Sequence, residues 1–506
     1  MSAKRTKQRV GVGRAATAGV LAAAVVVGIG HLVAAIVAPD SAPVLVVGAS
    51  IVDRTPQPVK TAIIEQFGAR DKLVLFACIG VGVLLLGAAT GLLVRRTRYG
   101  GAVFVVLGLA VAALAHSRPN ADALSWVATA VGVAAGLAAL AWMLSPRSAV
   151  DRSRREFLGI AAAVATVAAG AYVGSRVLAT KLRDIAADRL RFPVPQARMP
   201  APPVRPDMRI DTPSITPFTT PNRDFYRVDT ALRIPAVSAA EWRLRIHGMV
   251  DRETVLTFED LRSRQAVESM ITLTCVSNEV GGNLAGNAVW TGYPIAGLLA
   301  EAGVAPDADM VLSRSVDGFT AGTPLAALRD GRDALLAVAM NGEPLPLAHG
   351  YPARLVVPGL YGYVSATKWV IDLEVTRFDR AQAYWTTRGW AEQAPIKTAS
   401  RIDVPAAFGT VDAGPVVVAG VAWAQRRGIR SVEVQIDDGP WQRAELAAEY
   451  SIDTWRQWRW RWDATAGNHT IRVRATDGTG QRQTADRAAP IPDGASGWHS
   501  RVVTVR

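Results

Sequence analysis

A single cysteine at the end of a β-rich run has the clearest chemical potential in this 506-residue chain. Residues 270–273 form the apolar run, and Cys275 opens a loop of small, amide-bearing and glycine residues that extends to Asn283. A strand that ends in such a loop holds one thiol at the edge of a sheet. A thiolate is a soft ligand for redox-active transition metals, and a metal-bound thiol is deprotonated without a neighbouring base. On spacing alone, a small buried hydrophobe is the commoner role of such a cysteine, so both interpretations stay open.

Two blocks of sequence resemble the sulfite oxidase family of molybdopterin-dependent oxidoreductases. They comprise Cys275 to Asn283, Ala288 to Pro294, Ile295 to Leu299, Met340 to Pro346, His349 to Gly359, Tyr361, Gly362, Lys368 and Trp369. The resemblance extends over roughly residues 205 to 506. It implies two-electron oxygen-atom transfer at a molybdenum ion held by one molybdopterin and by Cys275, which is then both metal ligand and catalytic residue. The cofactor performs such chemistry, and the protein binds, orients and tunes it.

The resemblance also implies which side chains bind the pterin and its phosphate. Arg354 offers a planar fork for the phosphate, His349 a second donor, and Asp317 an acceptor for pterin ring nitrogens. The other implied contacts are Asn222, Tyr226, Arg227, Ser365, Thr367 and Lys368. Ordinary alternatives are a surface ion pair for Arg354 and turn positions for His349 and Asp317.

The residues after Cys275 depart from the sulfite-oxidising members of the family. Those members carry an arginine shortly after the molybdenum cysteine, whereas this chain has Asn278, Glu279 and Val280. A carboxylate near the metal repels anions, so we expect a neutral oxide or sulfoxide-like small molecule rather than sulfite. The chain has no His-Pro-Gly-Gly segment of the cytochrome b5 type, which implies an external electron carrier, either a cytochrome or quinone-linked. The rival hypothesis is a non-catalytic membrane-anchored receptor or scaffold that retains the fold.

The first part of the chain has the composition of a membrane protein. The chain is 50% hydrophobic with a positive mean hydropathy, and its two cysteines, Cys78 and Cys275, cannot build a disulfide framework. Apolar stretches of spanning or near-spanning length cover residues 15–38, 73–94, 101–115, 124–144 and 157–178, the third being short. Basic clusters at 4–9, 95–98 and 147–155 predict five crossings, a cytoplasmic N-terminus and an extracytoplasmic location after about residue 180. The formal charge of +13 therefore reflects orientation in the inner or plasma membrane, and we expect no nucleic-acid binding.

The fifth stretch begins with a motif that resembles a twin-arginine signal, Ser153 to Leu158. Two arginines also simply end a helix at the cytoplasmic face. The following Phe157-Leu158, and a downstream domain that would carry a cofactor made in the cytosol, favour export of a folded domain.

Two histidines lie in or beside the apolar stretches, His31 and His116. Paired histidines can ligate a haem b that relays electrons. The two depths differ, and a histidine at a helix end is commonly interfacial, so this haem is the weaker interpretation.

These features predict a multi-domain protein: an α-helical transmembrane bundle, an α+β sulfite-oxidase-type domain and a C-terminal all-β sandwich. The expected parts are a four-helix transmembrane region (1–150), a fifth transmembrane helix with the arginine signal (151–182), a Pro-rich tether (183–220), a molybdopterin-binding domain (221–395) and an immunoglobulin-like domain of the dimerisation type (396–506). Within them, residues 242–250 alternate like a half-buried strand and 257–261 begin a short helix. The sandwich is predicted from short alternating strands at 416–421, 432–436, 457–462 and 469–475. Trp458, Trp460 and Trp462 share one strand face, which favours core or interface packing over a cation-binding surface.

Overall fold

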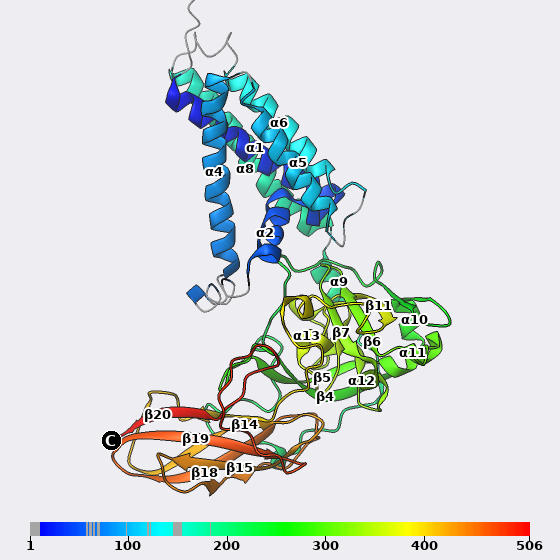
Figure 1. Cartoon of the computed structure of the whole chain (residues 1–506), viewed down its shortest axis with the longest axis vertical. Helices are drawn as coiled ribbons and strands as arrows, with labels where there is room; N and C mark the ends of the chain where they lie inside the picture. The colour runs from blue at the N-terminus through cyan, green and yellow to red at the C-terminus, as the bar shows by residue number, and fades with distance from the viewer. Residues whose placement is uncertain are drawn as a thin grey trace, which may run out of the picture. The chain divides into compact units, whose positions relative to one another are not determined.

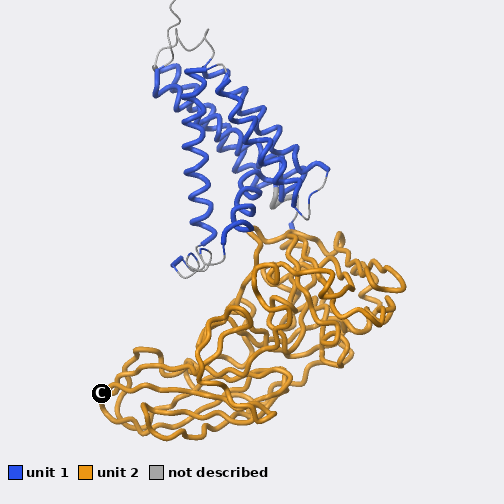
Figure 2. The backbone as a smooth tube through the Cα atoms, in the orientation of Figure 1, with its two compact units in different colours: residues 1–184 blue, residues 185–506 orange. Residues whose placement is uncertain are grey.

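The computed structural model describes residues 11–56, 71–97, 99–118, 123–144, 154–182 and 184–506, together with the single residues 59, 63, 66, 67 and 121. It divides into two compact units, residues 1–184 and 185–506 (Figure 2). The basic cluster at 4–9, Arg98 and most of the cluster at 147–155, Ser153 included, lie outside the described residues. Each unit has hydrophobic clusters of its own.

Unit 1 is a bundle of apolar helices. They are α1 (Val12–Val37), α2 (Pro43–Arg54), α4 (Asp71–Arg96), α5 (Ala102–His116), α6 (Val127–Leu144) and α8 (Arg154–Leu182), with a 3-10 turn at Pro39–Ser41. Among the described residues, α1, α4, α6 and the Arg155–Leu178 part of α8 are long and apolar enough to cross a membrane. Helix α5 has only 15 residues, in line with the short third stretch, whereas α2 was not predicted.

Glycines on α1 determine how closely its neighbours approach. Helix α1 packs against α4, α6 and α8. A Cβ at Gly19 would overlap the backbone of Gly87 and Gly91 on α4, and one at Gly28 would overlap Ala168 on α8. On α6, Gly132 faces the α1 backbone at Val26 and Gly30 in the same way. Small residues that allow backbones to touch are the usual means of packing helices in lipid, where no hydrophobic force acts between them.

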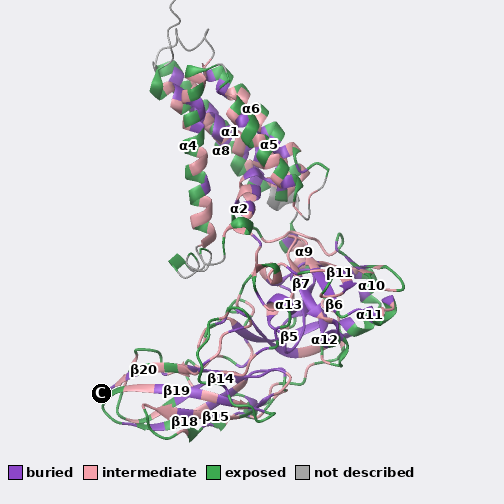
Figure 3. Cartoon of the chain, viewed as in Figure 1, coloured by how far each residue is buried: buried purple, intermediate pink, exposed green. Residues whose placement is uncertain are grey.

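The first part of unit 2 is built on two sheets (Figure 1). One has the order β1-β4-β5-β8-β10, with β9 paired to β8: β1 (Ala197–Met199), β4 (Ala266–Thr274), β5 (Ala285–Pro294), β8 (Leu335–Met340), β9 (Glu343–Pro344) and β10 (Arg354–Val356). The other has the order β3-β2-β11-β6-β7: β2 (Arg243–Gly248), β3 (Thr254–Thr257), β6 (Met310–Ser315), β7 (Thr320–Pro324) and β11 (Val370–Thr376). The helices are α9 (Ile185–Arg191), α10 (Phe258–Arg262), α11 (Ile295–Ala302), α12 (Leu325–Arg329) and α13 (Gly362–Ser365). Most residues of β4, β5 and β8 are buried, and Figure 3 shows buried residues around β5.

Local sequence signals account for several of these elements. In β2 the side chains of Leu244 and Ile246 are fully buried while their neighbours face outward, as the alternation predicted. Thr257 caps α10: its side chain accepts the Asp260 N–H, and the Asp260 carboxylate accepts the Thr257 N–H (2.7 Å). The predicted strand before Cys275 is β4, and its partner β5 lies between β4 and β8.

The Pro-rich segment, predicted as an extended tether, packs onto unit 2. Ile185 of α9 is buried, and Asp188 accepts a 2.6 Å hydrogen bond from the Tyr351 hydroxyl. Strand β1 runs parallel to β4, and the Ile210 N–H donates to Gln457 Oε1 (2.6 Å). Composition predicts the extended backbone, but it does not show that partners more than a hundred residues away occupy its hydrogen-bonding groups.

The second part of unit 2 consists of two facing sheets around a core. The sheets are β12-β14-β18-β17 and β13-β20-β19-β15-β16, with β12 (Ala399–Val404), β13 (Thr410–Val411), β14 (Gly414–Trp423), β15 (Ile429–Ile436), β16 (Gln442–Arg443), β17 (Glu445–Leu446), β18 (Arg456–Ala464), β19 (Gly467–Asp477) and β20 (His499–Val505). All four predicted strands are present. Trp458 and Trp462 are buried between the sheets and Trp460 packs against them, which confirms the core interpretation.

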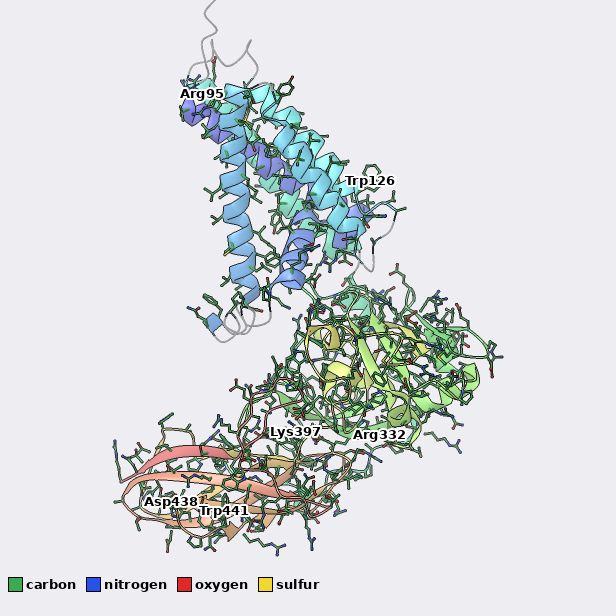
Figure 4. The ribbon with its side chains drawn as sticks, viewed as in Figure 1. Arg95, Trp126, Arg332, Lys397, Asp438 and Trp441 are labelled. Carbon is green, nitrogen blue, oxygen red and sulfur yellow. The ribbon has the colours of Figure 1, made fainter. Side chains whose placement is uncertain are left out.

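Several contacts join the two parts of unit 2. Lys397, labelled in Figure 4, donates from its N–H to the Tyr361 hydroxyl of the first part (3.4 Å) and from Nζ to Asp493 Oδ1 (2.8 Å) and Gly494 O (2.7 Å). Trp455 belongs to the core of the first part, because its Nε1 donates to Phe218 O (2.8 Å) and its N–H to Thr272 Oγ1 on β4 (2.8 Å).

Replacing Trp455 by alanine should destabilise unit 2 strongly. The indole is 1% exposed, and its loss creates a cavity behind β4, for which we expect about 3–5 kcal/mol of lost unfolding free energy. Phe408 is the control: it is 84% exposed, and Phe408→Ala should change stability by less than about 0.5 kcal/mol. Urea unfolding followed by tryptophan fluorescence measures both, and equal effects would contradict this account of the core.

Candidate functional site

The loop after β4 places Cys275 at the strand end, as predicted, and is closed by its own hydrogen bonds. The Cys275 N–H donates to Leu284 O (2.9 Å), and the Asn278 N–H to Cys275 O (3.1 Å). Asn278 Oδ1 accepts the Leu284 N–H (2.8 Å), so this buried amide closes the loop from within. The Cys275 side chain is therefore held by a compact turn at the junction of β4 and β5.

The Cys275 thiol is buried, and burial raises its pKa. Hydrogen bonds from Ser277 and the charge of Lys368 act in the opposite direction without cancelling the effect of burial. In the metal-free protein the residue is a protonated thiol at neutral pH. Coordination of a metal cation would remove that proton directly.

Arg354 on β10 is a buried cation without a carboxylate partner. Its guanidinium bonds only to backbone carbonyls, those of His349 (3.1 Å), Leu355 (3.4 Å) and Ala366 (3.4 Å). It also lies 5.0 Å from the centre of the buried Trp290 ring. Throughout residues 184–506, no carboxylate lies within ion-pair distance of it, and burial lowers its pKa to about 10. Such an arrangement fits an anionic ligand, because an uncompensated buried charge is costly.

Lys368 is the second buried cation of the site. Its Nζ donates to Asp229 Oδ2 (2.8 Å) and to Ala348 O (3.3 Å). Burial lowers the pKa of Lys368 to about 8, although Asp229 opposes the shift. Arg227 Nε pairs with the same carboxylate (2.7 Å), so one acid serves two cations. Asp229 was not predicted, and the Arg227-x-Asp229 spacing was the signal that could have identified it.

His349 is a neutral hydrogen-bond donor. Its Nε2 lies 3.2 Å from the carbonyl oxygen of Asn222, and a carbonyl only accepts, so the ring proton is on Nε2. Burial, together with Arg354 and Lys368, lowers the pKa of His349 to about 4. The Phe225 ring packs against His349 (5.6 Å between ring centres) and fixes its orientation.

The other predicted residues surround this cluster but differ in what they offer. Tyr226 is close enough to Cys275 and Arg354 for both charges to act on it, and burial raises the pKa of its hydroxyl. Asn222 bonds Met340 O (3.2 Å) and Asn341 Nδ2 (2.8 Å), and Asp317 accepts from Thr230 Oγ1 (3.4 Å) and the Phe319 N–H (3.3 Å).

The hydroxyls of Ser365 and Thr367 are used inside the fold. The Ser365 hydroxyl donates to Leu360 O (3.1 Å) or to Tyr361 O (3.0 Å). The Thr367 hydroxyl is hydrogen-bonded to the Ser313 hydroxyl (2.7 Å). Both side chains are fully buried, so they hold the segment that carries Lys368.

The protein side chains of the site would not hold a metal by themselves. Among the described residues, no group of three His, Cys, Asp or Glu side chains is placed to ligate one ion. A metal at Cys275 would therefore take most of its ligands from a bound cofactor.

Comparisons with known proteins agree with this chemistry. Residues 231–385 match the family model described as the oxidoreductase molybdopterin binding domain. Mitochondrial sulfite oxidase of Homo sapiens is 28% identical over 323 residues, which cover 54% of this chain and 58% of that protein. The uncharacterized oxidoreductase YuiH of Bacillus subtilis (strain 168) is 34% identical over 150 residues, 30% of this chain and 72% of that protein. The crystal structure of the sulfane dehydrogenase SoxCD from Paracoccus pantotrophus shares the fold, with a TM-score of 0.51 and 24% identity over 58% of this chain and 85% of that one. The chain spans little more than half the length of the sulfite oxidases that it matches.

The buried histidines should make the cofactor-free protein sensitive to acid. Burial lowers the pKa of both His349 and His499 to about 4. Between the unfolded value near 6.5 and about 4, the unfolded chain binds protons that the native chain does not. Stability therefore falls with falling pH, by about 1.4 kcal/mol per pH unit for each histidine.

A urea-unfolding series from about pH 7 down to about pH 5 measures this effect. His349→Gln should show a shallower pH dependence than wild type by about one proton. His469→Gln is the control with the opposite sign, because Asp437 raises the pKa of His469 and its contribution is lost as pH rises. Parallel curves for wild type and His349→Gln would contradict the assignment of a neutral His349.

Proposed function

The chain belongs to the sulfite oxidase family of molybdopterin-dependent oxidoreductases, and from that premise we propose that it binds a molybdenum-molybdopterin cofactor through Cys275 and transfers oxygen atoms. When bound, the cofactor supplies two-electron oxygen-atom transfer. Cys275 supplies the protein's sulfur ligand from the compact loop after β4. Its burial keeps bulk water from the metal side of the site.

The buried Arg354 without a carboxylate is the observation that carries this proposal. A terminal phosphate would satisfy the N–H groups that now reach only distant carbonyls, and it would compensate the buried charge. Lys368 and the neutral donor His349 lie in the same region, as their mutual electrostatic effects indicate. The cation set thus fits a dianionic group beside a thiolate.

The remaining predicted residues take supporting positions in the proposal. Tyr226, Asn222, Arg227 and Asp317 would contact the pterin, with Arg227 held by Asp229. Ser365 and Thr367 fix the segment that leads to Lys368.

The loop after Cys275 supports a neutral substrate. Asn278, at a position near the family's sulfite-binding arginine, closes the loop and is buried, while Glu279 is exposed. No cation from this loop replaces that arginine, and a carboxylate stands beside it. We therefore propose a neutral oxide or sulfoxide-like small molecule, with electrons exchanged through an external cytochrome or quinone-linked carrier.

The rival hypothesis is a receptor or scaffold that keeps the fold without catalysis. A site that no longer binds a cofactor is under no constraint to keep buried, partly unpaired cations, which destabilise the empty protein. Cys275, Arg354 and Lys368 are all present, and the charge of Lys368 acts on the Cys275 thiol, which supports the enzyme.

The location and assembly of the protein are part of the same proposal. The apolar helices anchor it in the inner or plasma membrane, the charge pattern puts unit 2 outside, and the two-sheet sandwich from about residue 396 is an immunoglobulin-like domain that supports a homodimer. Residues 221–395 would form the cofactor-binding domain. His31 bonds Val27 O through Nδ1 and packs on Tyr172 (5.3 Å between ring centres), and a haem b on His31 and His116 is the weaker proposal, testable by absorbance.

Elemental analysis of the purified full-length protein tests the metal site. Wild type should contain about one molybdenum per chain, and Cys275→Ala less than about a tenth of that, because it lacks the soft protein ligand. Cys78→Ala is the matched control and should retain the metal. Absence of molybdenum and pterin from the wild type would refute the proposal and favour the rival hypothesis of a non-catalytic receptor or scaffold.

Substituting both Arg154 and Arg155 by lysine tests the export route. The signal requires arginines, so we expect unit 2 to stay on the cytoplasmic side, whereas lysines preserve the charge that orients helices. External protease should then no longer cleave unit 2. Lysines at Arg95 and Arg96 are the control, and an unchanged cleavage pattern in the Arg154/Arg155 variant would refute twin-arginine export.

A further inference from the structure

The turn that follows Cys275 is backed by residues of the C-terminal sandwich, which lie far from it in the sequence. His499 begins β20 and packs on Gly281, and Arg401 of β12 binds the next residue, Gly282. Behind the preceding strand, Gln425 Nε2 donates to Thr272 O (3.0 Å). Nothing in the proposed function so far uses these contacts.

His499 is held so that its ring occupies the space beside Gly281. Its Nδ1 accepts the Ile402 N–H (2.9 Å), so the ring proton is on Nε2. Gly281 has φ +82°, and a Cβ built there would overlap the imidazole. Two features therefore disfavour any side chain at position 281: the left-handed backbone conformation and the His499 ring.

Arg401 holds the carbonyl of Gly282 with a guanidinium that is fixed on all sides. Nη1 donates to Gly282 O (2.8 Å), Nε to Asp403 Oδ1 (2.7 Å) and Nη2 to Thr216 Oγ1 (2.7 Å). The side chains of Arg401 and Asp403 are both 8% exposed. A buried guanidinium held by three different partners positions each of them more rigidly than a surface contact does.

A short path connects this turn to the cysteine. The Gly282 N–H donates to Glu279 O (2.9 Å), and the space beside Gly282 is filled by Asn278 Oδ1, which accepts the Leu284 N–H. Leu284 O in turn accepts the Cys275 N–H (2.9 Å). A displacement of Gly282 therefore reaches Cys275 through one packing contact, with Asn278, and two hydrogen bonds through Leu284.

We propose that His499 and Arg401 are positioning residues for the Cys275 sulfur, so that the C-terminal sandwich is part of the active site. The claim about the metal rests on the proposed function, whereas the claim about the loop does not. Residues outside the ligand shell commonly set ligand orientation and thereby the properties of a metal. The sandwich would then tune the molybdenum centre as well as stabilise unit 2.

Reactivity of the Cys275 thiol in cofactor-free protein tests the loop directly. The full-length chain carries Cys78→Ser, so that Cys275 is the remaining thiol, and is made in cells that cannot synthesise molybdopterin. His499→Asn keeps an acceptor for the Ile402 N–H but removes most of the ring, and we expect alkylation by iodoacetamide to be about tenfold faster, because the loop opens more often. His469→Asn is the matched control on neighbouring β19, where the ring bonds Asp437 and Thr465, and should react at the wild-type rate.

A double mutant separates local coupling from general destabilisation. Gly281→Ala should also accelerate alkylation, but Gly281→Ala with His499→Asn should accelerate it less than the product of the two, because the methyl group enters the space left by the ring. Multiplicative effects, or an unchanged rate in His499→Asn, would overturn the proposal. Arg401→Met should act in the same direction as His499→Asn, through loss of the bond to Gly282.

The molybdenum-loaded protein supplies a readout that stability alone does not move. His499→Asn should shift the Mo(V) electron paramagnetic resonance signal at unchanged molybdenum content, and His469→Asn should not. A wild type without molybdenum, combined with the expected alkylation rates, would refute the proposed function and leave the positioning of the loop intact. If the wild type contains molybdenum but His499→Asn changes neither the alkylation rate nor the electron paramagnetic resonance signal, the positioning role is refuted and the proposed function stands.

Discussion

The burial of positive charge near Cys275 is the constraint on which the site depends. Arg354 and Lys368 are buried, Arg227 is exposed but pairs with the same acid as Lys368, and that acid is Asp229. These four side chains therefore carry two positive charges more than negative ones, in a region where desolvation already lowers the pKa of Arg354 and Lys368. A protein keeps such an arrangement when a ligand of opposite charge completes it. The rest of unit 2 maintains it through backbone carbonyls, the Trp290 ring and the packed segments that carry His349 and Lys368.

Unit 2 holds the two halves of the site by different means. The thiol side depends on a turn between two antiparallel strands, closed by the buried amide of Asn278. The cation side depends on β10 and on a second segment. In that segment the hydroxyls of Ser365 and Thr367 form hydrogen bonds to other groups of the protein. The contacts of His499 and Arg401 are with the thiol side, at Gly281 and Gly282, which is the basis of the role proposed for them.

The parts that sequence reasoning predicted correctly are those in which signal and structure are local. The alternation of β2, the cap of α10, the strand that ends at Cys275 and the buried Trp458 and Trp462 all follow from neighbouring residues. The pairing of Asp229 with Lys368 was missed because it joins residues far apart in the chain. Helix α2 has 12 residues within a stretch of mixed character, too short to register as a membrane span. The packing of the Pro-rich segment and of His499 on Gly281 depends on contacts that no short window of sequence contains.

Helix α9 ties the start of unit 2 to the block that carries His349. Asp188 accepts the hydroxyl of Tyr351, and Arg189 donates to the carbonyls of Pro344 (2.7 Å) and Leu345 (2.8 Å). A version of the protein without the apolar helices of unit 1 would thus have to begin at or before Ile185. A chain that began after the proline-rich stretch would lack α9, β1 and Asp188, the acceptor of the buried Tyr351 hydroxyl. The segment that looks dispensable by composition is therefore required for a folded unit 2.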